Sequence, residues 1–114
     1  MNIKKGEIYL AALDPVLGKE ISKTRPVVIV SNNKNNLFSG TVTILPISSQ
    51  NVDKIYLFEL FLPKGSGNLP KESKVKADQI RTIDKIRIIR HVGTLKKAEV
   101  DDIDKAIKIH LDLS

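Results

Sequence analysis

The sequence predicts a mainly β fold, a small β-barrel on which one C-terminal α-helix packs. Three short runs of β-branched and other apolar residues, at 26–30, 41–47 and 55–62, are bounded by polar, proline or glycine residues, as strands are. After residue 94 the apolar period changes from that of a strand to that of a helix. A chain of 114 residues has the size of one domain. We therefore expect residues 1–114 to form a single domain, with residues 1–93 as the barrel and residues 94–114 as the helix.

The first part of the chain predicts two strands separated by a loop. Residues 7–13 have extended character and end at an Asp-Pro pair, since proline removes a ladder donor and restricts the residue before it. Residues 16–24 contain a glycine and several charged residues and predict a long loop. The run at 26–30 is apolar on both faces, which is typical of a buried central strand. Residues 31–36 are rich in asparagine and predict a turn.

Further strand regions are expected before the helix. Residues 41–47 form a second β-branched run, and residues 55–62 form a third with Glu59 as its only charge. Residues 73–92 alternate irregularly between apolar and basic side chains, which predicts one or two strands broken near residues 84–85. With about five short strands in so small a chain, closure into a barrel is the favoured architecture.

The last segment predicts an amphipathic helix. Apolar residues recur three or four positions apart, at Val100, Ile103, Ile107 and Leu111. Acidic residues precede lysines at i,i+4, the order that favours a helix, and acids crowd its first turns. Thr94 is the expected N-cap.

The composition excludes several classes of protein. No cysteine is present, which excludes a disulfide framework, a thiolate metal site and a cysteine nucleophile, and suits a reducing compartment such as the cytoplasm. The two histidines, His91 and His110, lack the neighbouring ligands of a helical metal site, so we expect no metal and no cofactor. No apolar run approaches the roughly 20 residues of a membrane span, and no signal-peptide pattern is visible near the start.

The net charge of +6 is unevenly distributed. Four lysines stand against five acids from residue 94 onward, whereas residues 1–93 contain 15 basic and 8 acidic groups. This surplus favours attraction to a polyanion. With only two tyrosines, three phenylalanines and no tryptophan, few rings are left for stacking on bases. Bases should therefore be read mainly by hydrogen bonds, with Asn32, Asn33, Gln50 and Gln79 as candidate readers.

A polar cluster precedes the buried run at 26–30. It consists of Glu20, Ser22, Lys23 and Arg25. An arginine next to a buried strand has its stem fixed by packing, which helps the guanidinium meet a phosphate in a defined geometry. Taken alone, the pattern favours a simpler interpretation, a surface ion pair between Arg25 and Glu20.

Two further polar groups lie at later strand ends. Ser48 on its own is best explained as a turn serine that hydrogen-bonds the backbone, and no nucleophile elbow or acid–histidine pair indicates a hydrolase triad. The second group alternates with apolar residues and should project from one face; it consists of Lys76, Asp78, Gln79 and Arg81. A solvated charged face usually explains such a pattern, and contact with nucleic acid is the alternative.

Taken in order, these clusters resemble the MazF/PemK toxin family. The resemblance rests on Gly6-Glu-Ile-Tyr-Leu, Leu13-Asp-Pro-Val-Leu-Gly-Lys-Glu20, Lys23-Thr-Arg-Pro-Val-Val-Ile-Val30-Ser-Asn, Leu45-Pro-Ile-Ser48 and Asp78-Gln-Ile-Arg-Thr-Ile-Asp84-Lys. Each motif alone is weakly specific, whereas their order and spacing are strongly so and cover nearly the whole chain. The resemblance implies an SH3-like β-barrel of the CcdB/PemK-like fold with the C-terminal helix packed on it.

The resemblance also implies a function. It implies the toxin of a type II toxin–antitoxin system, an mRNA interferase that acts as a sequence-specific, metal-independent endoribonuclease on single-stranded RNA. The implied partners are a second copy of the chain and an acidic antitoxin whose extended tail competes with RNA for the basic surface. DNA would be contacted only through the antitoxin, and a membrane not at all.

Residue by residue, the resemblance assigns a site. The family's catalytic arginine falls on Arg25, and its catalytic hydroxyl, usually a threonine, falls on Ser48. Serine keeps the hydroxyl but loses the methyl that stiffens χ1, so activity should survive. Lys76 and Asp78 match positions where some members carry an Arg and an Asp implicated in cleavage, and Glu20 lies in the family's mobile loop. The residues expected to bind RNA are Lys19, Ser22, Lys23, Asn32, Gln50, Lys76, Gln79 and Arg81.

The reaction that the family implies is attack of the ribose 2′-hydroxyl on the adjacent phosphorus, leaving a 2′,3′-cyclic phosphate and a 5′-hydroxyl. It needs stabilisation of the phosphoryl charge, a proton acceptor and a proton donor. Arg25 suits the first role, with Ser48 as a second donor to the phosphate. Because arginine does not readily give up its proton, Glu20 or Asp78 is the expected acceptor.

Two other functions stay open on the sequence. The first is a toxin of the same fold that poisons gyrase by binding it, without catalysis. It would not explain why Arg25, Ser48 and the Asp78-Gln79 pair match the nuclease pattern together. The second is a barrel that binds nucleic acid without cutting it, in which Ser48 would mark lost activity.

Overall fold

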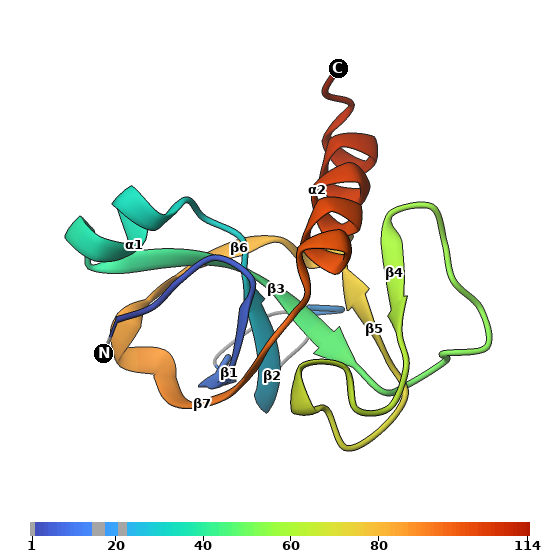
Figure 1. Cartoon of the computed structure of the whole chain (residues 1–114), viewed down its shortest axis with the longest axis horizontal. Helices are drawn as coiled ribbons and strands as arrows, with labels where there is room; N and C mark the ends of the chain where they lie inside the picture. The colour runs from blue at the N-terminus through green and yellow to red at the C-terminus, as the bar shows by residue number, and fades with distance from the viewer. Residues whose placement is uncertain (1, 15–17, 21–22) are drawn as a thin grey trace.

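A computed structural model describes residues 2–14, 18–20 and 23–114. The described residues form an antiparallel sheet and a C-terminal helix, which confirms the predicted mainly β class (Figure 1). The strands are β1 (Glu7–Ala12), β2 (Thr24–Ile29), β3 (Thr41–Ser48), β4 (Glu59–Leu62), β5 (Ser73–Lys76), β6 (Arg81–Asp84) and β7 (Ile88–Thr94). The helices are α1 (Asn33–Phe38) and α2 (Lys97–Leu111), and the 3₁₀ turns are η1 (Ser66–Asn68), η2 (Ala77–Gln79) and η3 (Lys85–Arg87).

The sheet is open rather than fully closed. Its strand order is β4-β5-β3-β2-β1-β7, with β6 also paired to β3. β3, at eight residues, is central: its start pairs with β6, its end pairs with β5, and β2 runs along its other edge. Closure would require the end strand β4 to pair with the end strand β7. Instead, β4 pairs with β5, and β5 in turn pairs with the last two residues of β3. Within the described ranges no pairing joins the two end strands, so the expected closure of the barrel is not observed.

Two apolar cores lie on the two faces of the sheet. The core under α2 contains Ile8, Val28, Leu45, Ile47, Leu62, Val75, Ile103 and Ala106. The core on the other face contains Tyr9, Val27, Ile29, Val42, Ile44 and Ile83. Successive residues of β2 enter alternate cores, because side chains alternate along a strand. β2 is therefore the buried central strand that the run at 26–30 predicts.

A short helix stands where residues 31–36 predict a turn. α1 begins after Asn32, whose side-chain oxygen accepts a hydrogen bond from the Asn35 amide nitrogen at 2.8 Å. Asn36 is buried, and its side-chain amide donates to the Ser31 carbonyl oxygen at 2.8 Å. The asparagines that indicate a turn thus cap and anchor a helix instead.

The strand expected at 55–62 begins only at Glu59. The Glu59 backbone nitrogen donates to the Tyr56 carbonyl oxygen at 2.9 Å, and the Tyr56 backbone nitrogen donates to the Glu59 carboxylate at 3.0 Å. These two bonds close a turn, so the first half of the apolar run cannot pair as a strand.

The segment at 73–92 holds three strands, β5, β6 and β7, and not the expected one or two. The expected break near residues 84–85 is confirmed by η3, whereas the break at η2 lacks the glycine or proline that would signal it.

α2 begins after Lys96 rather than Thr94, because the Glu99 carboxylate accepts a hydrogen bond from the Lys96 backbone nitrogen at 3.0 Å. No helix in the described part of the chain is long and apolar enough to cross a membrane.

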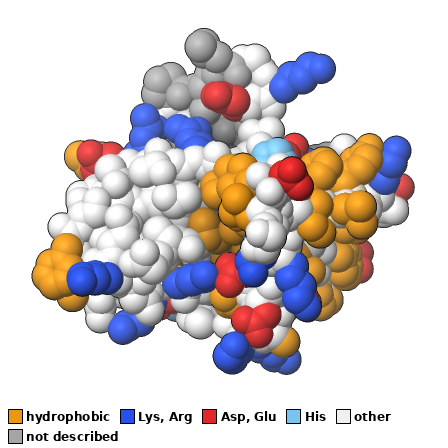
Figure 2. All heavy atoms as spheres, turned by 90° about the horizontal axis from the view of Figure 1, so that it is seen from above, with side chains coloured by type: hydrophobic (Ala, Val, Ile, Leu, Met, Phe, Trp, Pro, Cys, Tyr) orange, Lys and Arg blue, Asp and Glu red, His pale blue; other side chains and the backbone are white. Residues whose placement is uncertain are grey.

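Apolar side chains stay exposed around the C-terminal end of α2. Figure 2 shows hydrophobic side chains gathered on the face that carries this end. The exposed residues are Ile109, Leu111 and Leu113 on the helix side and Ile55, Tyr56 and Leu57 in the segment before β4. The two segments meet where the rings of Phe58 and His110 lie 5.9 Å apart.

Candidate active site

A row of polar side chains crosses neighbouring strands of the sheet. β2 and β3 pair so that Val27 lies opposite Pro46, and the same register two residues further brings Arg25 level with Ser48. β5 pairs with the end of β3 and puts Lys74 opposite Ser48. Cross-strand partners share a face, so these side chains gather although they come from three distant parts of the sequence.

The row lies on the face of the sheet opposite α2. Lys74 and Lys76 are two residues apart on β5 and project together, whereas Val75 between them packs in the core under α2. β4 adds Glu59, which lies opposite Lys76. Arg25, Ser48, Lys74, Lys76 and Glu59 therefore belong to one surface.

This surface is hollowed into a cleft of about 310 Å³. The cleft is lined by Glu20, Arg25, Ser48, Gln50, Asn51, Lys74 and Lys76. Glu20 comes from the loop before β2, and Gln50 and Asn51 come from the turn after β3. Of the lining residues, Asn51 and Lys74 were not expected from the sequence, and the others were.

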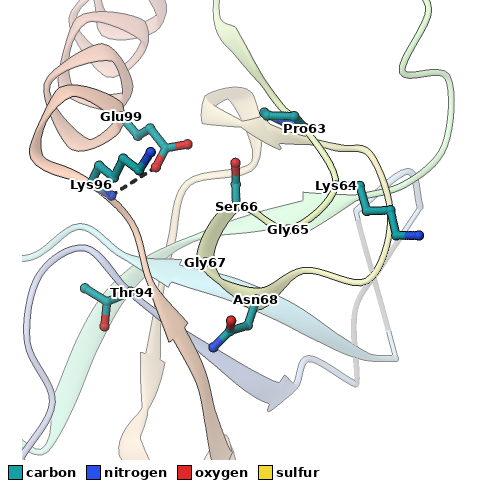
Figure 3. Close-up of a pocket in the computed structure, with 9 residues that line it drawn as sticks. All are labelled: Pro63, Lys64, Gly65, Ser66, Gly67, Asn68, Thr94, Lys96 and Glu99. Atoms are coloured by element: carbon teal, nitrogen blue, oxygen red, sulfur yellow. Dashed lines mark hydrogen bonds between the residues drawn. The ribbon is translucent and has the colours of Figure 1, made fainter.

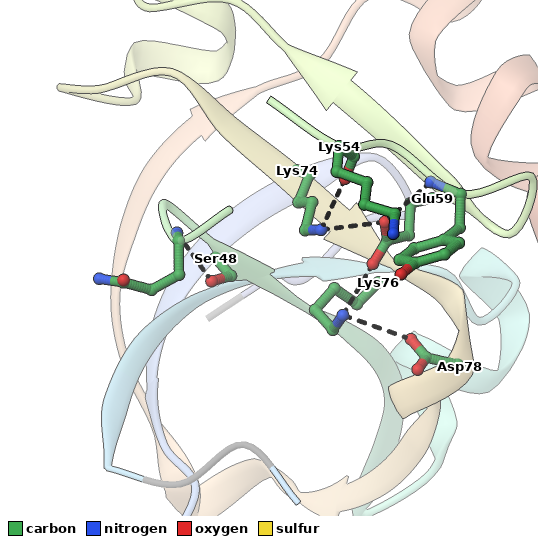
Figure 4. Close-up of polar contacts among 8 residues, drawn as sticks. Ser48, Lys54, Glu59, Lys74, Lys76 and Asp78 are labelled. Atoms are coloured by element: carbon green, nitrogen blue, oxygen red, sulfur yellow. Dashed lines mark hydrogen bonds and ion pairs between the residues drawn. The ribbon is translucent and has the colours of Figure 1, made fainter. Parts of the chain in front are cut away.

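Ser48 is buried, and the backbone holds its oxygen (Figure 4). The Gln50 backbone nitrogen donates a hydrogen bond to Ser48 Oγ at 3.1 Å, which is the bond of a turn serine. Because this bond uses a lone pair of the oxygen, the hydroxyl hydrogen remains available as a donor. Ser48 can thus accept the backbone hydrogen bond of a turn and still donate a hydrogen bond into the cleft.

Glu59 is a buried carboxylate between two lysines (Figure 4). Its Oε1 lies 3.0 Å from Lys74 Nζ and its Oε2 lies 2.7 Å from Lys76 Nζ. Burial by itself would raise the pKa of Glu59, but hydrogen bonds from Lys76, the Tyr56 backbone nitrogen and Lys74 outweigh it and hold the pKa below its usual value. Glu59 is therefore ionised at neutral pH.

Asp78 stands beside the cleft and not in its lining. It lies on η2 with Oδ1 3.9 Å from Lys76 Nζ, and this buried oxygen accepts no hydrogen bond from the described residues. The described residues contain no group of at least three acidic or histidine side chains that could hold a metal ion.

Besides Asn32, four predicted RNA-binding residues of the described chain do not line the cleft. In the described part of the chain these are Lys19, Lys23, Gln79 and Arg81. The Lys23 backbone nitrogen donates to Asp14 Oδ1 at 2.9 Å, which shapes the entry to β2. Arg81 Nη1 donates to the Leu13 carbonyl oxygen at 3.3 Å and ties β6 to the end of β1. Lys19 is exposed beside Glu20, and Gln79 ends η2.

Asn32 lies on another part of the surface. It caps α1 and lines a hollow beside α2 together with Lys5, Asp104 and Lys108. Lys5 Nζ and Asp104 Oδ1 form an ion pair of 3.0 Å there. Ser22, the remaining predicted residue, lies outside the described residues.

Besides Asn51, sequence reasoning missed Lys74 and Glu59. The signal for Glu59 was its position as the only charge in an apolar run, because a carboxylate buried in a strand needs a charged partner. The partners themselves depend on the register of β4 against β5, which spans a long loop and is not written in local sequence.

A larger hollow of about 460 Å³ lies between the loop that contains η1 and the start of α2 (Figure 3). Its lining contains Lys64, Ser66, Asn68, Lys96 and Glu99. The Glu99 carboxylate is already used to cap α2. None of the residues predicted for catalysis or RNA binding lines it, so the cleft at Arg25 is the better candidate.

Comparison with known proteins shows the family of this chain. Residues 4–111 match the model of the PemK-like, MazF-like toxins of type II toxin–antitoxin systems. The chain is similar to Endoribonuclease MazF9 of Mycobacterium tuberculosis, with 38% identity over 116 residues that cover 97% of this chain and 98% of the relative. It is also similar to the crystal structure of MazF from Deinococcus radiodurans, with a TM-score of 0.85 at 22% identity over 99% of each chain.

A further similar structure is an endoribonuclease in complex with its cognate antitoxin from Mycobacterial species. Its TM-score is 0.75 at 21% identity, over 99% of this chain and 96% of that chain. At this identity the solved structures show the fold, and the family model matched over residues 4–111 shows the family. The chain therefore belongs to the PemK-like, MazF-like toxin family of type II toxin–antitoxin systems.

Proposed function

We propose that this protein is the toxin of a type II toxin–antitoxin pair and acts as a metal-independent endoribonuclease on single-stranded RNA. Family membership supports the toxin role, and the similar protein from Mycobacterium tuberculosis is named an endoribonuclease. The observation that carries the proposal is that Glu20, Arg25 and Ser48 line one cleft. A carboxylate, a guanidinium and a hydroxyl are the groups that internal cleavage of RNA needs.

In the proposed reaction, the Glu20 carboxylate accepts the proton of the ribose 2′-hydroxyl, whose oxygen attacks the adjacent phosphorus. The bond from phosphorus to the 5′-oxygen breaks, and that oxygen takes a proton from water. The products are a 2′,3′-cyclic phosphate and a 5′-hydroxyl. Arg25 and Ser48 donate hydrogen bonds to the phosphoryl oxygens, and these bonds strengthen as negative charge develops in the transition state.

Glu20 is a better candidate than Asp78 for the proton acceptor. Glu20 lines the cleft with Arg25, whereas Asp78 lies beside Lys76 outside the lining. A general base must come within hydrogen-bond reach of the hydroxyl that it deprotonates. Glu20→Gln should therefore slow single-turnover cleavage far more than Asp78→Asn does. Wild-type rates in both variants would mean that no carboxylate acts as the base.

The proposed partners are an acidic antitoxin and a second copy of this chain. The cleft carries Arg25, Lys74 and Lys76, so it would attract an acidic peptide as it attracts RNA, and the two ligands would compete. The similar Mycobacterial endoribonuclease is bound to its cognate antitoxin. The exposed apolar side chains around the end of α2 support self-association. Contact with DNA would occur only through the antitoxin, and the proposed location is the cytoplasm.

The function is tested by incubating the protein with a long single-stranded RNA of known sequence in EDTA and mapping the new ends. We expect cuts at one short recurring sequence that leave 5′-hydroxyl ends. Arg25→Ala should keep the fold, as judged by circular dichroism, and lose about 10²–10³-fold in rate. Intact RNA would contradict cleavage and favour a toxin or a barrel that only binds. Cleavage that stops in EDTA would contradict the metal-independent mechanism.

A further inference from the structure

The row beside the cleft contains a carboxylate that the proposed reaction does not use directly. The Glu59 side chain is 0% exposed, that of Lys74 is 5% exposed, and that of Lys76 is 21% exposed. Lys74 Nζ also donates to the Lys54 carbonyl oxygen at 3.0 Å and lies 5.8 Å from the centre of the Tyr56 ring. Lys74 is thus enclosed by protein groups, whereas Lys76 reaches the open part of the cleft.

Glu59 lies between the ammonium groups of Lys74 and Lys76 and offsets the repulsion between them. Lys74 and Lys76 project from the same face of β5, so their charges repel each other. Glu59 binds one ammonium with each carboxylate oxygen, and the Tyr56 backbone nitrogen donates to the same carboxylate. A flexible lysine that is held at its tip by a buried acceptor keeps one orientation.

We propose that Glu59 is a positioning residue for RNA cleavage, which holds the Lys76 ammonium at the cleft so that this group contacts a phosphoryl oxygen at the scissile nucleotide beside Arg25. Lys74 forms an ion pair with the other oxygen of the carboxylate and so keeps the Glu59 side chain in place. This inference rests on the proposed function, because it concerns the same cleft and the same substrate.

Positioning and simple electrostatics predict different effects of Glu59→Gln. If only net charge matters, removing a negative charge next to the cleft favours binding of a polyanion and does not slow the reaction. If Glu59 positions Lys76, the same change lowers kcat, because the ammonium is no longer held where charge develops in the transition state. KM should not rise in either case. The change in kcat therefore separates the two.

A double variant separates positioning from stability. Glu59→Gln leaves Lys74 buried without its carboxylate, which should destabilise the fold. Adding Lys74→Met removes both buried charges and fills the space of the lysine stem, so stability should return toward wild type. In both variants Lys76 loses the Glu59 carboxylate at 2.7 Å and keeps only the longer contact of 3.9 Å with Asp78. Asp102→Asn makes the same change of charge on α2, across the sheet from the cleft, and serves as the matched control.

The experiment measures multiple-turnover cleavage of an oligoribonucleotide that spans the mapped cut, together with urea unfolding of the same preparations. We expect kcat to fall about 10- to 100-fold in both the single and the double variant. KM should not rise, and the unfolding midpoint should fall clearly only in the single variant. Asp102→Asn should match wild type.

Two outcomes would overturn the inference about Glu59 and leave the proposed function intact. The first is a wild-type kcat in Glu59→Gln, whether or not KM rises. The second is a double variant that regains both stability and kcat, which would leave Glu59 a purely structural role. Should Glu59→Gln fail to fold, the double variant alone decides the question through its kcat. Failure of the wild-type protein to cut RNA would overturn the proposed function and this inference with it.

Discussion

At the scale of single residues, Ser48 makes a structural hydrogen bond and, in the proposed reaction, also donates to the phosphate. Its oxygen accepts a hydrogen bond from the Gln50 backbone nitrogen at 3.1 Å, while its hydroxyl hydrogen can still donate into the cleft. In a threonine at this position, the β-methyl would restrict χ1. Here the hydrogen bond from the Gln50 backbone nitrogen restrains the oxygen of Ser48.

Substitutions at Ser48 should separate these two contributions. Ser48→Ala removes one donor to the developing phosphoryl charge and should lower the cleavage rate about 10²-fold, with a loss of about 1 kcal/mol in the free energy of unfolding. Ser48→Thr keeps the hydroxyl and should cleave at a rate close to wild type. Single-turnover cleavage and urea unfolding measure both effects. An alanine variant that cleaves at the wild-type rate would remove Ser48 from the mechanism.

The sequence predicted some residues of the candidate site and not others, for a physical reason. From the residues alone, Arg25 and Ser48 each had a simpler explanation, and only the order of the motifs placed them in one site. The structure brings both to one cleft with Glu20 and Lys76. The ion pairs of Glu59 could not be predicted, because the register of two strands joined across a long loop depends on packing throughout the sheet.

At the scale of elements, a polar cluster fastens the edge strand β7 to β1. Tyr9 lies opposite His91, and their rings make an edge contact with centroids 5.2 Å apart. The Tyr9 hydroxyl donates to Glu7 Oε1 at 3.0 Å, and His91 Nε2 lies 3.5 Å from Glu7 Oε2. Glu7 therefore contacts a side chain on each strand.

This cluster predicts a loss of stability in alkali. Burial, the hydrogen bond to Glu7 and the charge of Glu7 raise the pKa of Tyr9 to about 12, from an ordinary value of 10.0. Between these two values the unfolded chain releases the phenol proton and the folded chain keeps it, so the free energy of unfolding falls as the pH rises. Urea midpoints should drop across this range in the wild type and drop less in Tyr9→Phe. Equal slopes in the two proteins would contradict the assignment.

Elements defined by local pattern were predicted well, and elements that depend on distant contacts were not. The buried strand β2 and the helix α2 have a periodicity that is visible in the sequence. The late start of β4 follows from the turn that Glu59 closes with Tyr56, and no propensity of residues 55–58 indicates it. The 3₁₀ turn η2 interrupts a segment in which no glycine or proline marks a break.

At the scale of the whole molecule, the basic surplus and the C-terminal helix belong to different parts of the fold. The basic surplus of residues 1–93 belongs to the sheet and its loops, and the cleft with Arg25 and Lys76 opens on the face opposite α2. The segment from residue 94 onward, which forms α2, carries more acids than lysines. A polyanion should therefore approach the molecule from the side of the cleft.

This asymmetry predicts which lysine governs the salt dependence of the reaction. The logarithm of kcat/KM should fall linearly with the logarithm of salt concentration between about 50 and 200 mM. Lys76→Ala removes one contact to phosphate and should reduce the slope by about 0.7, as expected for single-stranded nucleic acid. Lys97→Ala, on the exposed side of α2, should leave the slope unchanged. A similar reduction in both variants would mean that net charge alone sets the salt dependence.

The placement of α2 across the sheet from the cleft has a practical consequence. The chain contains no cysteine, so a cysteine introduced for the exposed Asp101 would be the only thiol in the protein. A fluorophore attached there would be separated from Arg25 and Ser48 by the full thickness of the sheet. Its anisotropy would then report the slower tumbling of the protein–RNA complex while the dye leaves the cleft free.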